Sequence, residues 1–145
     1  MATRLGQWDE LHAGALQTFR EAASARPGAA DQLVHALLDE DDVDGAWQAL
    51  HDHDCASSTW LTAAPRRAAT HPGDTIPVYR HAVEEQIDHK KANAYRAAAD
   101  SVRVLRDLHS RCGTPQEFRD YLDQLRERHR RKTRLLAELD KAGLR

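Results

Sequence analysis

The sequence has little of what small proteins use for covalent cross-links or membrane insertion. Only two of its 145 residues are cysteines, Cys55 and Cys112. A helical domain of this size needs no disulfide for its stability, so we expect two separate, reduced thiols. No apolar run approaches the roughly 20 residues that cross a bilayer, and the first residues lack the apolar core of a signal peptide. We therefore expect a cytoplasmic protein without a membrane span.

Motifs for catalysis are missing as well. The chain has no glycine-rich phosphate loop, no nucleophile elbow and no pair of carboxylates in a catalytic context. These absences favour a protein that is not an enzyme and needs no cofactor. The alternation of apolar and polar residues that marks a half-buried strand is also missing, which leaves helices as the expected secondary structure.

Apolar residues recur at every third or fourth position along most of the chain, which is the pattern of amphipathic helices. The composition, with 41% hydrophobic and 30% charged residues, is that of one soluble globular domain. We expect a single all-α domain over residues 1–145 with about seven helices. These form either an irregular stack of helical hairpins, of the α-solenoid or TPR-like kind, or an orthogonal bundle. No tidy repeat of ~34 residues demands a regular array.

Capping residues and breaks divide this pattern into separate helices. The expected segments are 3–25, 31–38, a helix from Val43 that closes near 51–55, one capped by Ser57 and Ser58, one capped by Asp74, one over 93–112, and one from Thr114. Pro65 lacks a backbone N–H and its ring clashes with the preceding turn. We therefore expect a kink or an early end of the fourth helix there.

The last segment carries the clearest start signals. Gly113 can adopt the left-handed conformation that ends a helix, and Thr114 can cap the next one in a capping box with Glu117. An apolar stripe follows at Phe118, Tyr121, Leu122 and Leu125. The spacing leaves two alternatives open: one long helix that is exposed around residues 128–134, or two helices with a break there.

From residue 60 onward, aromatic, apolar and basic positions fall in a recognisable order. They are Trp60, Leu61, Arg67, His71, Pro72, Val78, Tyr79, Asn93, Tyr95, Ala98, Leu105, Phe118, Tyr121, Leu122, Leu125, Arg126, His129, Arg131, Lys132, Leu135 and Leu136. This order resembles the C-terminal helical region of bacterial SWIM zinc-finger proteins, which are common in actinobacteria. The resemblance covers about residues 43–145 and implies a helical, repeat-like fold.

The resemblance does not extend to the zinc finger itself. A SWIM finger needs a Cys-x-Cys pair followed by Cys-x-His, whereas Cys55 and Cys112 stand far apart in the chain. No zinc ligand is carried over to this sequence. The nucleic-acid or protein binding attributed to the finger is therefore not inherited.

Charge is divided unequally between the two halves of the chain. Residues 1–64 carry three arginines against eleven acidic residues, a net charge of −8, and residues 65–145 carry 18 basic residues against 12 acidic ones, a net charge of +6. Such a separation can steer a partner or favour head-to-tail association of copies. Alternatively, the two ends attract each other across the fold.

The densest basic stretch places six cations within nine positions. They are Arg126, Arg128, Arg130, Arg131, Lys132 and Arg134. Basic residues of this kind can bind phosphates, but on a helix these six spread around the cylinder, and acidic neighbours can pair with some of them. We predict these residues as the binding segment, with a solvated or partner-facing helix as the first interpretation and nucleic-acid binding as the second.

His51, His53 and Cys55 form the most metal-like cluster. A closed zinc site needs four ligands, and residues two apart on a helix point away from each other. We therefore expect a solvent-facing helix end, with metal binding as the alternative. His109 and Cys112 form a second pair, but a thiolate near a helix C-terminus is disfavoured by the helix dipole.

Together these features predict a non-catalytic helical module that presents a groove or its basic C-terminal helix to a protein partner, an acidic one in particular. Nucleic-acid binding through residues 126–134 is the alternative, an enzyme using residues 51–55 is a third hypothesis, and homo-oligomers stay open.

Trp8, Trp47 and Trp60 lie on apolar faces, where core packing is expected. An exposed one among them would be an interface anchor.

Overall fold

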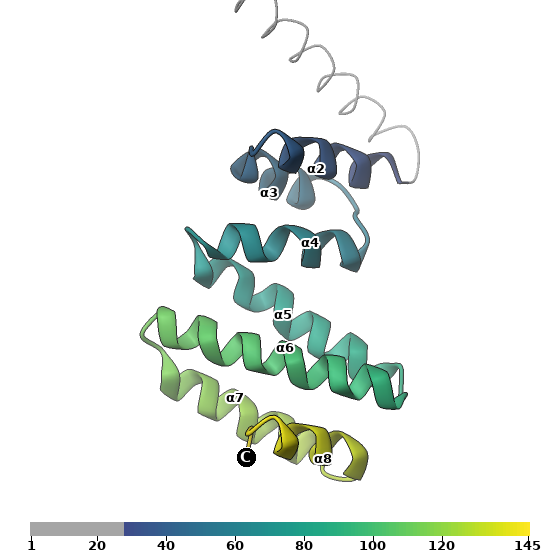
Figure 1. Cartoon of the computed structure of the whole chain (residues 1–145), viewed down its shortest axis with the longest axis vertical. Coiled ribbons are helices and arrows are strands. Elements are labelled where there is room, and N and C mark those ends of the chain that lie inside the picture. The colour runs from purple at the N-terminus through teal and green to yellow at the C-terminus, as the bar shows by residue number, and fades with distance from the viewer. Residues whose placement is uncertain (1–27) are drawn as a thin grey trace, which may run out of the picture. The chain divides into compact units, whose positions relative to one another are not determined.

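The structure is a computed structural model that describes residues 28–145. These residues contain seven helices and no strand, so the all-α fold class that the apolar spacing predicts is confirmed (Figure 1). The chain divides into two compact units, Met1–Arg67 and Ala68–Arg145. The helix predicted over 3–25 lies outside the described residues. Within residues 28–145, no helix is long and apolar enough to cross a membrane.

In the first unit, α2 (Ala29–Asp39) and α3 (Val43–Asp52) lie side by side (Figure 1). Leu33, Leu37 and Leu50 are almost completely buried. Asp42 caps α3, because its side chain accepts a hydrogen bond of 3.0 Å from the backbone N–H of Gly45.

Helix α4 (Ser57–Ala68) is joined to α2 and α3 by polar contacts at both of its ends. At its start, the carboxylate of Asp31 accepts hydrogen bonds from the backbone N–H of Ala56 and the hydroxyl of Thr59. At its end, Arg66 donates to the backbone carbonyl of Leu38 at 2.7 Å. The early end predicted at Pro65 does not occur, because α4 runs on to Ala68. Only three residues follow the proline, and the first of them, Arg66, is the one that donates to Leu38.

In the second unit, α5 (Pro72–Asp88) and α6 (Ala92–Arg111) form a helical hairpin with extensive mutual contact (Figure 1). Between them Lys90 turns the chain in the left-handed conformation, with a φ of 57°. The helix cap predicted at Asp74 is wrong, since α5 begins at Pro72. Proline is favoured at the first helical position because its fixed φ suits the helix and its missing N–H would have no partner there.

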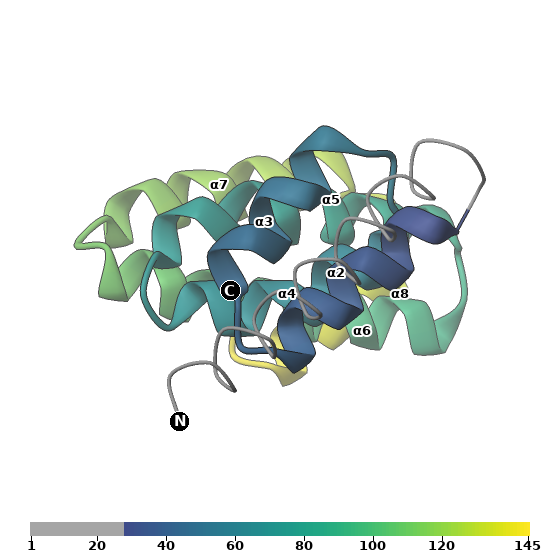
Figure 2. The ribbon, with the colours of Figure 1, turned by 90° about the horizontal axis from the view of Figure 1, so that it is seen from above.

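Two shorter helices complete this unit, α7 (Pro115–Arg128) and α8 (Thr133–Lys141). The chain therefore breaks over residues 129–132, which decides between the two alternatives that the spacing left open. Both helices pack against α6, and α8 lies along it (Figure 2). Leu125, Leu135 and Leu139 are fully buried. Burial of a leucine side chain stabilises a fold by about 1.5–3 kcal/mol, so these residues attach α7 and α8 firmly.

The turn between α6 and α7 is a Schellman motif. The backbone N–H of Thr114 donates to the carbonyl of His109 at 2.8 Å, and that of Gly113 donates to the carbonyl of Ser110 at 3.2 Å. Gly113 has a φ of 71°, the left-handed conformation predicted for it. The capping box with Glu117 is not formed, because the hydroxyl of Thr114 bonds to His109 instead of to its own helix.

Replacing glycine at this turn should therefore destabilise the fold. We expect Gly113→Ala to lower the free energy of unfolding by about 1 kcal/mol, because a Cβ disfavours the left-handed conformation by roughly 1–2 kcal/mol and part of this is offset in the unfolded chain. Urea unfolding followed by far-ultraviolet circular dichroism measures the change.

Gly73→Ala is the matched control. Gly73 lies in the first turn of α5 without a positive φ, and its Cβ would lie 3.8 Å from the sulfur of Cys112, an ordinary contact. This variant should be stabilised by about 0.4–1 kcal/mol. Equal effects of the two alanines would contradict the assigned turn.

Candidate functional site

Three of the six predicted binding residues are held by carboxylates of the second unit. Arg126 is directed toward the end of the chain, where it donates to the backbone carbonyl of Leu144 at 2.9 Å and forms an ion pair with Asp140 at 3.1 Å. Arg128 lies 2.8 Å from the carboxylate of Glu84 on α5. These contacts give Arg126 and Arg128 a structural role in joining helices.

The carboxylate of Glu84 binds a second group from the same loop. The Nε2 atom of His129 lies 3.1 Å from it, and this imidazole is largely buried. Arg130 pairs with Glu127 one turn earlier in the chain, at 3.1 Å, with both side chains exposed. Exposed pairs of this kind contribute little to stability, about 0–1 kcal/mol.

The other three predicted residues form no such pair. Within residues 28–145, Arg131, Lys132 and Arg134 have no hydrogen bond or ion pair through their side chains. An open hollow of about 270 Å³ is lined by residues 127–132. The structure therefore divides the basic segment into three residues with carboxylate partners and three without one in the described part of the chain.

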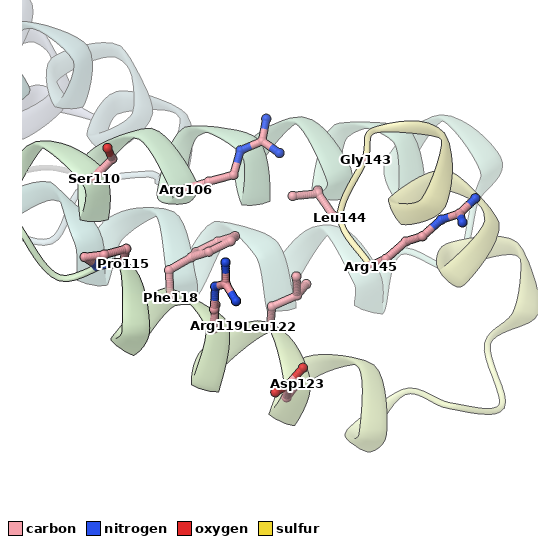
Figure 3. A pocket seen from close by; sticks show the side chains of 10 residues that line it. All are labelled: Arg106, Ser110, Pro115, Phe118, Arg119, Leu122, Asp123, Gly143, Leu144 and Arg145. Atoms are coloured by element: carbon pink, nitrogen blue, oxygen red, sulfur yellow. The ribbon is translucent and has the colours of Figure 1, made fainter.

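A larger cleft lies between α6, α7 and the end of the chain (Figure 3). Its volume is about 500 Å³, and its lining residues are Arg106, Ser110, Pro115, Phe118, Arg119, Leu122, Asp123, Gly143, Leu144 and Arg145. We call it the α6–α7 cleft. Phe118, Leu122 and Leu144 form its apolar floor, since each is buried and only their edges reach solvent.

A second Schellman motif closes this cleft at the end of α8. Gly143 has a φ of 78°, and the backbone N–H of Leu144 donates to the carbonyl of Leu139 at 2.8 Å. In such a motif the residue after the left-handed glycine commonly packs back onto the helix. Here Leu144 turns toward the space between α6 and α7 (Figure 3). Arg126 donates to its carbonyl oxygen.

Cations surround the cleft. Arg106 extends from α6, Arg119 from α7 and Arg145 from the end of the chain, while Asp123 is the one acidic residue of the lining (Figure 3). Within the described part of the chain, none of these three arginines forms an ion pair or a side-chain hydrogen bond. Arginine binds carboxylates and phosphates through a planar fork of N–H donors, so the rim of this cleft is suited to an anionic group.

The sequence prediction did not include these residues, although one signal for them was present. In an antiparallel helical hairpin, residues at equal distance from the turn lie opposite each other. Arg106 and Arg119 stand seven and six positions from Gly113, so the turn places them on facing helices. The contribution of Leu144 was harder to see, because it depends on a turn that brings the end of the chain back to α6.

Beside the cleft, His109 is almost completely buried, with 1% of its surface exposed. Its Nε2 atom lies 3.5 Å from Nη2 of Arg80, and its Nδ1 atom lies 2.9 Å from the hydroxyl oxygen of Thr114. A guanidinium can only donate, so Nε2 accepts and Nδ1 carries the proton. Burial, and then the charge of Arg80, lower the pKa of His109, whereas Glu117 and Thr114 oppose that shift.

Arg80 also covers the ring of Tyr121, with its Cζ atom 4.7 Å from the ring centroid. Burial, followed by the charge of Glu84, raises the pKa of Tyr121 to about 12, and Arg80 and Arg128 oppose this shift. The phenol thus stays protonated at neutral pH. Together, Arg80, His109 and Tyr121 form a polar contact that joins α5, α6 and α7. Their placement indicates a structural role.

The cluster of His51, His53 and Cys55 does not converge in the structure. The Nδ1 atom of His51 donates to the backbone carbonyl of Trp47 at 2.8 Å, and His53 follows the end of α3 with an extended backbone. Burial, and then the carboxylates of Asp31 and Asp54, raise the pKa of the Cys55 thiol. Among residues 28–145, no three histidine, cysteine or acidic side chains gather as metal ligands do.

The tryptophans of the described region belong to the packing of the first unit. Trp47 is buried and meets Trp60 edge to face, with ring centroids 5.4 Å apart, and the ring of His51 lies 5.1 Å from Trp60. Trp60 is only partly buried. Core packing therefore accounts for Trp47 and most of Trp60, and Trp8 lies outside the described residues.

Comparison with known proteins gives no relative. No family model matches the chain, and no match was found among curated proteins or among solved structures. The resemblance to the helical region of SWIM zinc-finger proteins accordingly stays a prediction from the residues that carry it.

The burial of His109 makes the stability of the fold depend on pH. Its pKa lies below the ordinary value of 6.5, so the unfolded chain binds the proton more readily than the folded one. The contribution of this group is present above about pH 6.5 and is lost as the pH falls from there through the lowered pKa. We expect His109→Gln to reduce the loss of unfolding free energy between about pH 7 and pH 5.

His81→Gln provides the control, because the side chain of His81 is 75% exposed beside Glu85. Its stability should follow the wild-type pH dependence. Urea unfolding at a series of pH values distinguishes the variants, and a pH dependence that is unchanged in His109→Gln would show that this histidine does not titrate as described.

Proposed function

We propose that the chain is a non-catalytic helical module that binds a protein partner. One observation supports this proposal above the others: an apolar-floored cleft of about 500 Å³ is bordered by arginines that have no carboxylate partner in the described part of the chain. Apolar area next to exposed arginine is typical of protein interfaces, where aromatic residues and arginine are enriched.

The placement of the reactive side chains supports the same function. His109 and Tyr121 are engaged in the contact between helices, and the thiol of Cys55 has a raised pKa, which lowers its reactivity. A general acid or base must reach the reacting atoms of a substrate. A surface that offers cations and apolar edges is better suited to binding than to chemistry.

Selection from a displayed library of random peptides against the full chain tests this function. We expect enrichment of peptides that combine acidic with large apolar residues, because the cleft offers arginines over an apolar floor. A library that lacks acidic residues is the control and should give no enrichment. Failure of both libraries, with the chain shown to be folded by circular dichroism, would contradict a peptide-binding function.

Nucleic-acid binding is the second candidate, favoured by Arg131, Lys132 and Arg134, three cations without an ion pair among residues 28–145. Its salt dependence is a sharp criterion, because the logarithm of the binding constant falls with the logarithm of the salt concentration by about 0.9 per phosphate contacted in duplex DNA. Three free cations predict a slope of about −3, whereas all six basic residues would give about −5.

Filter binding of a DNA duplex at several salt concentrations measures this slope. The triple variant Arg131→Gln, Lys132→Gln, Arg134→Gln should abolish the salt-dependent binding, while Arg130→Gln should change it little because Arg130 is paired with Glu127. If the duplex is not retained even at low salt, nucleic-acid binding is excluded as a function of this segment.

A further inference from the structure

The α6–α7 cleft continues onto the outer face of α6. A second hollow of about 660 Å³ is lined by Asp100, Arg103, Val104, Arg106, Asp107 and Ser110, and it shares Arg106 and Ser110 with the cleft. Among residues 28–145, Val104 is the one large hydrophobic side chain that is exposed, with 37% of its surface accessible. An apolar contact point thus stands beside the apolar floor of the cleft.

Charge on this surface is polarised. Asp100 and Asp107 lie three and four positions from Arg103, the spacing at which helical side chains are neighbours, and Asp123 stands four positions from Arg119 in the same way. No acidic residue except Asp123 lines the cleft beside Arg106, Arg119 and Arg145. Among the described residues, three arginines against one aspartate therefore give the cleft a net positive lining, whereas Arg103 and Arg106 in the second hollow stand beside two aspartates.

From this arrangement we propose that the α6–α7 cleft and Val104 form the docking site of an acidic segment of a partner protein. One apolar side chain of the segment covers Phe118, Leu122 and Leu144, and another contacts Val104. Carboxylates of the segment bind Arg106 and Arg119, which extend from facing helices (Figure 3). This assignment rests on the proposed protein-binding function and specifies its partner.

The acidic half of a second copy of the chain is a weaker occupant. Its most acidic turn includes Asp41, Asp42 and Asp44, but Asp41 is paired with Arg66, Asp44 with Arg67, and Asp42 caps α3. Docking this turn on another copy would require these contacts to be shared or broken. A head-to-tail contact of this kind would also leave unsatisfied ends and lead to open chains of molecules.

Nucleic acid is also a weaker occupant of the cleft. Single strands bind where aromatic faces are open for base stacking, whereas only 6% of the surface of Phe118 is exposed. Asp107 and Asp123 would in addition repel a phosphate backbone. In an acidic protein segment, by contrast, apolar residues separate the carboxylates. Each carboxylate can therefore approach one arginine between Asp107 and Asp123.

Fluorescence anisotropy of the full chain with a defined probe tests the proposal. The probe is a labelled synthetic peptide of glutamate, aspartate, leucine and phenylalanine. We expect Arg106→Glu and Arg119→Glu each to weaken its binding about tenfold, because each change replaces an attraction by a repulsion. Arg134→Glu is the matched control: it makes the same charge change on an exposed arginine outside the cleft, and it should weaken binding less than twofold.

Val104→Ser tests the apolar part of the site. Val104 is exposed, so the variant should keep the wild-type circular dichroism spectrum while it binds the acidic peptide about three-fold more weakly. A peptide in which lysine and arginine replace the acidic residues should bind neither the wild type nor these variants.

The outcomes separate this proposal from the general function. If the acidic peptide binds and Arg134→Glu weakens it as much as Arg119→Glu, the cleft is not the docking site, although a protein-binding function stands. Absence of binding by any peptide overturns both. Stronger binding of a single-stranded oligonucleotide, with the same dependence on Arg119, overturns the protein partner, and self-association that is lost in Arg119→Glu replaces it by a second copy of the chain.

Discussion

The second unit depends on the burial of α6 against three neighbouring helices. Its apolar positions, which include Val102, Leu105 and Leu108, are almost completely removed from solvent. No single neighbour can cover a helix that is apolar on this much of its circumference, so α5, α7 and α8 all pack against it. Each large side chain buried in this way contributes about 1.5–3 kcal/mol, which makes α6 the framework for the whole unit.

The α6–α7 cleft follows from this arrangement. Because α7 and α8 must both lie against α6, the chain reverses over residues 129–132 and again at Gly143. The second reversal places Leu144 between the helices, where Arg126 binds its carbonyl oxygen. The contacts between helices use Arg126, Arg128 and His129, and arginines without an ion pair among residues 28–145 are left around the cleft. Packing thus determines which cations support the fold and which are available to a partner.

Much of the fold could be predicted from local sequence, because local interactions determine it. The apolar stripe predicted at Phe118, Tyr121, Leu122 and Leu125 is the buried face of α7, and the left-handed position of Gly113 was predicted from its place after α6. Thr114 is the N-cap residue of α7, as predicted, but its hydroxyl bonds to His109 of the preceding helix instead of capping α7, a choice that the capping-box pattern does not show.

The candidate site was less predictable for the same reason. Residues 126–134 were predicted as the binding segment because basic residues are dense there. The density of charge along the sequence does not show which arginines have carboxylate partners elsewhere in the unit. Glu84 and Asp140 decide this, and they are 44 positions before Arg128 and 14 after Arg126. Arg106 and Arg119 stand out only when the facing helices and the buried Leu144 are seen together.

Amide chemical-shift mapping of the full chain during titration with the acidic peptide tests the central claim most directly. Binding at the α6–α7 cleft predicts that the largest shift changes fall within residues 104–110, 118–123 and 143–145, the segments that contain most of the residues lining the cleft and its extension on α6. Changes confined to residues 130–134, or spread evenly over both units, would contradict it.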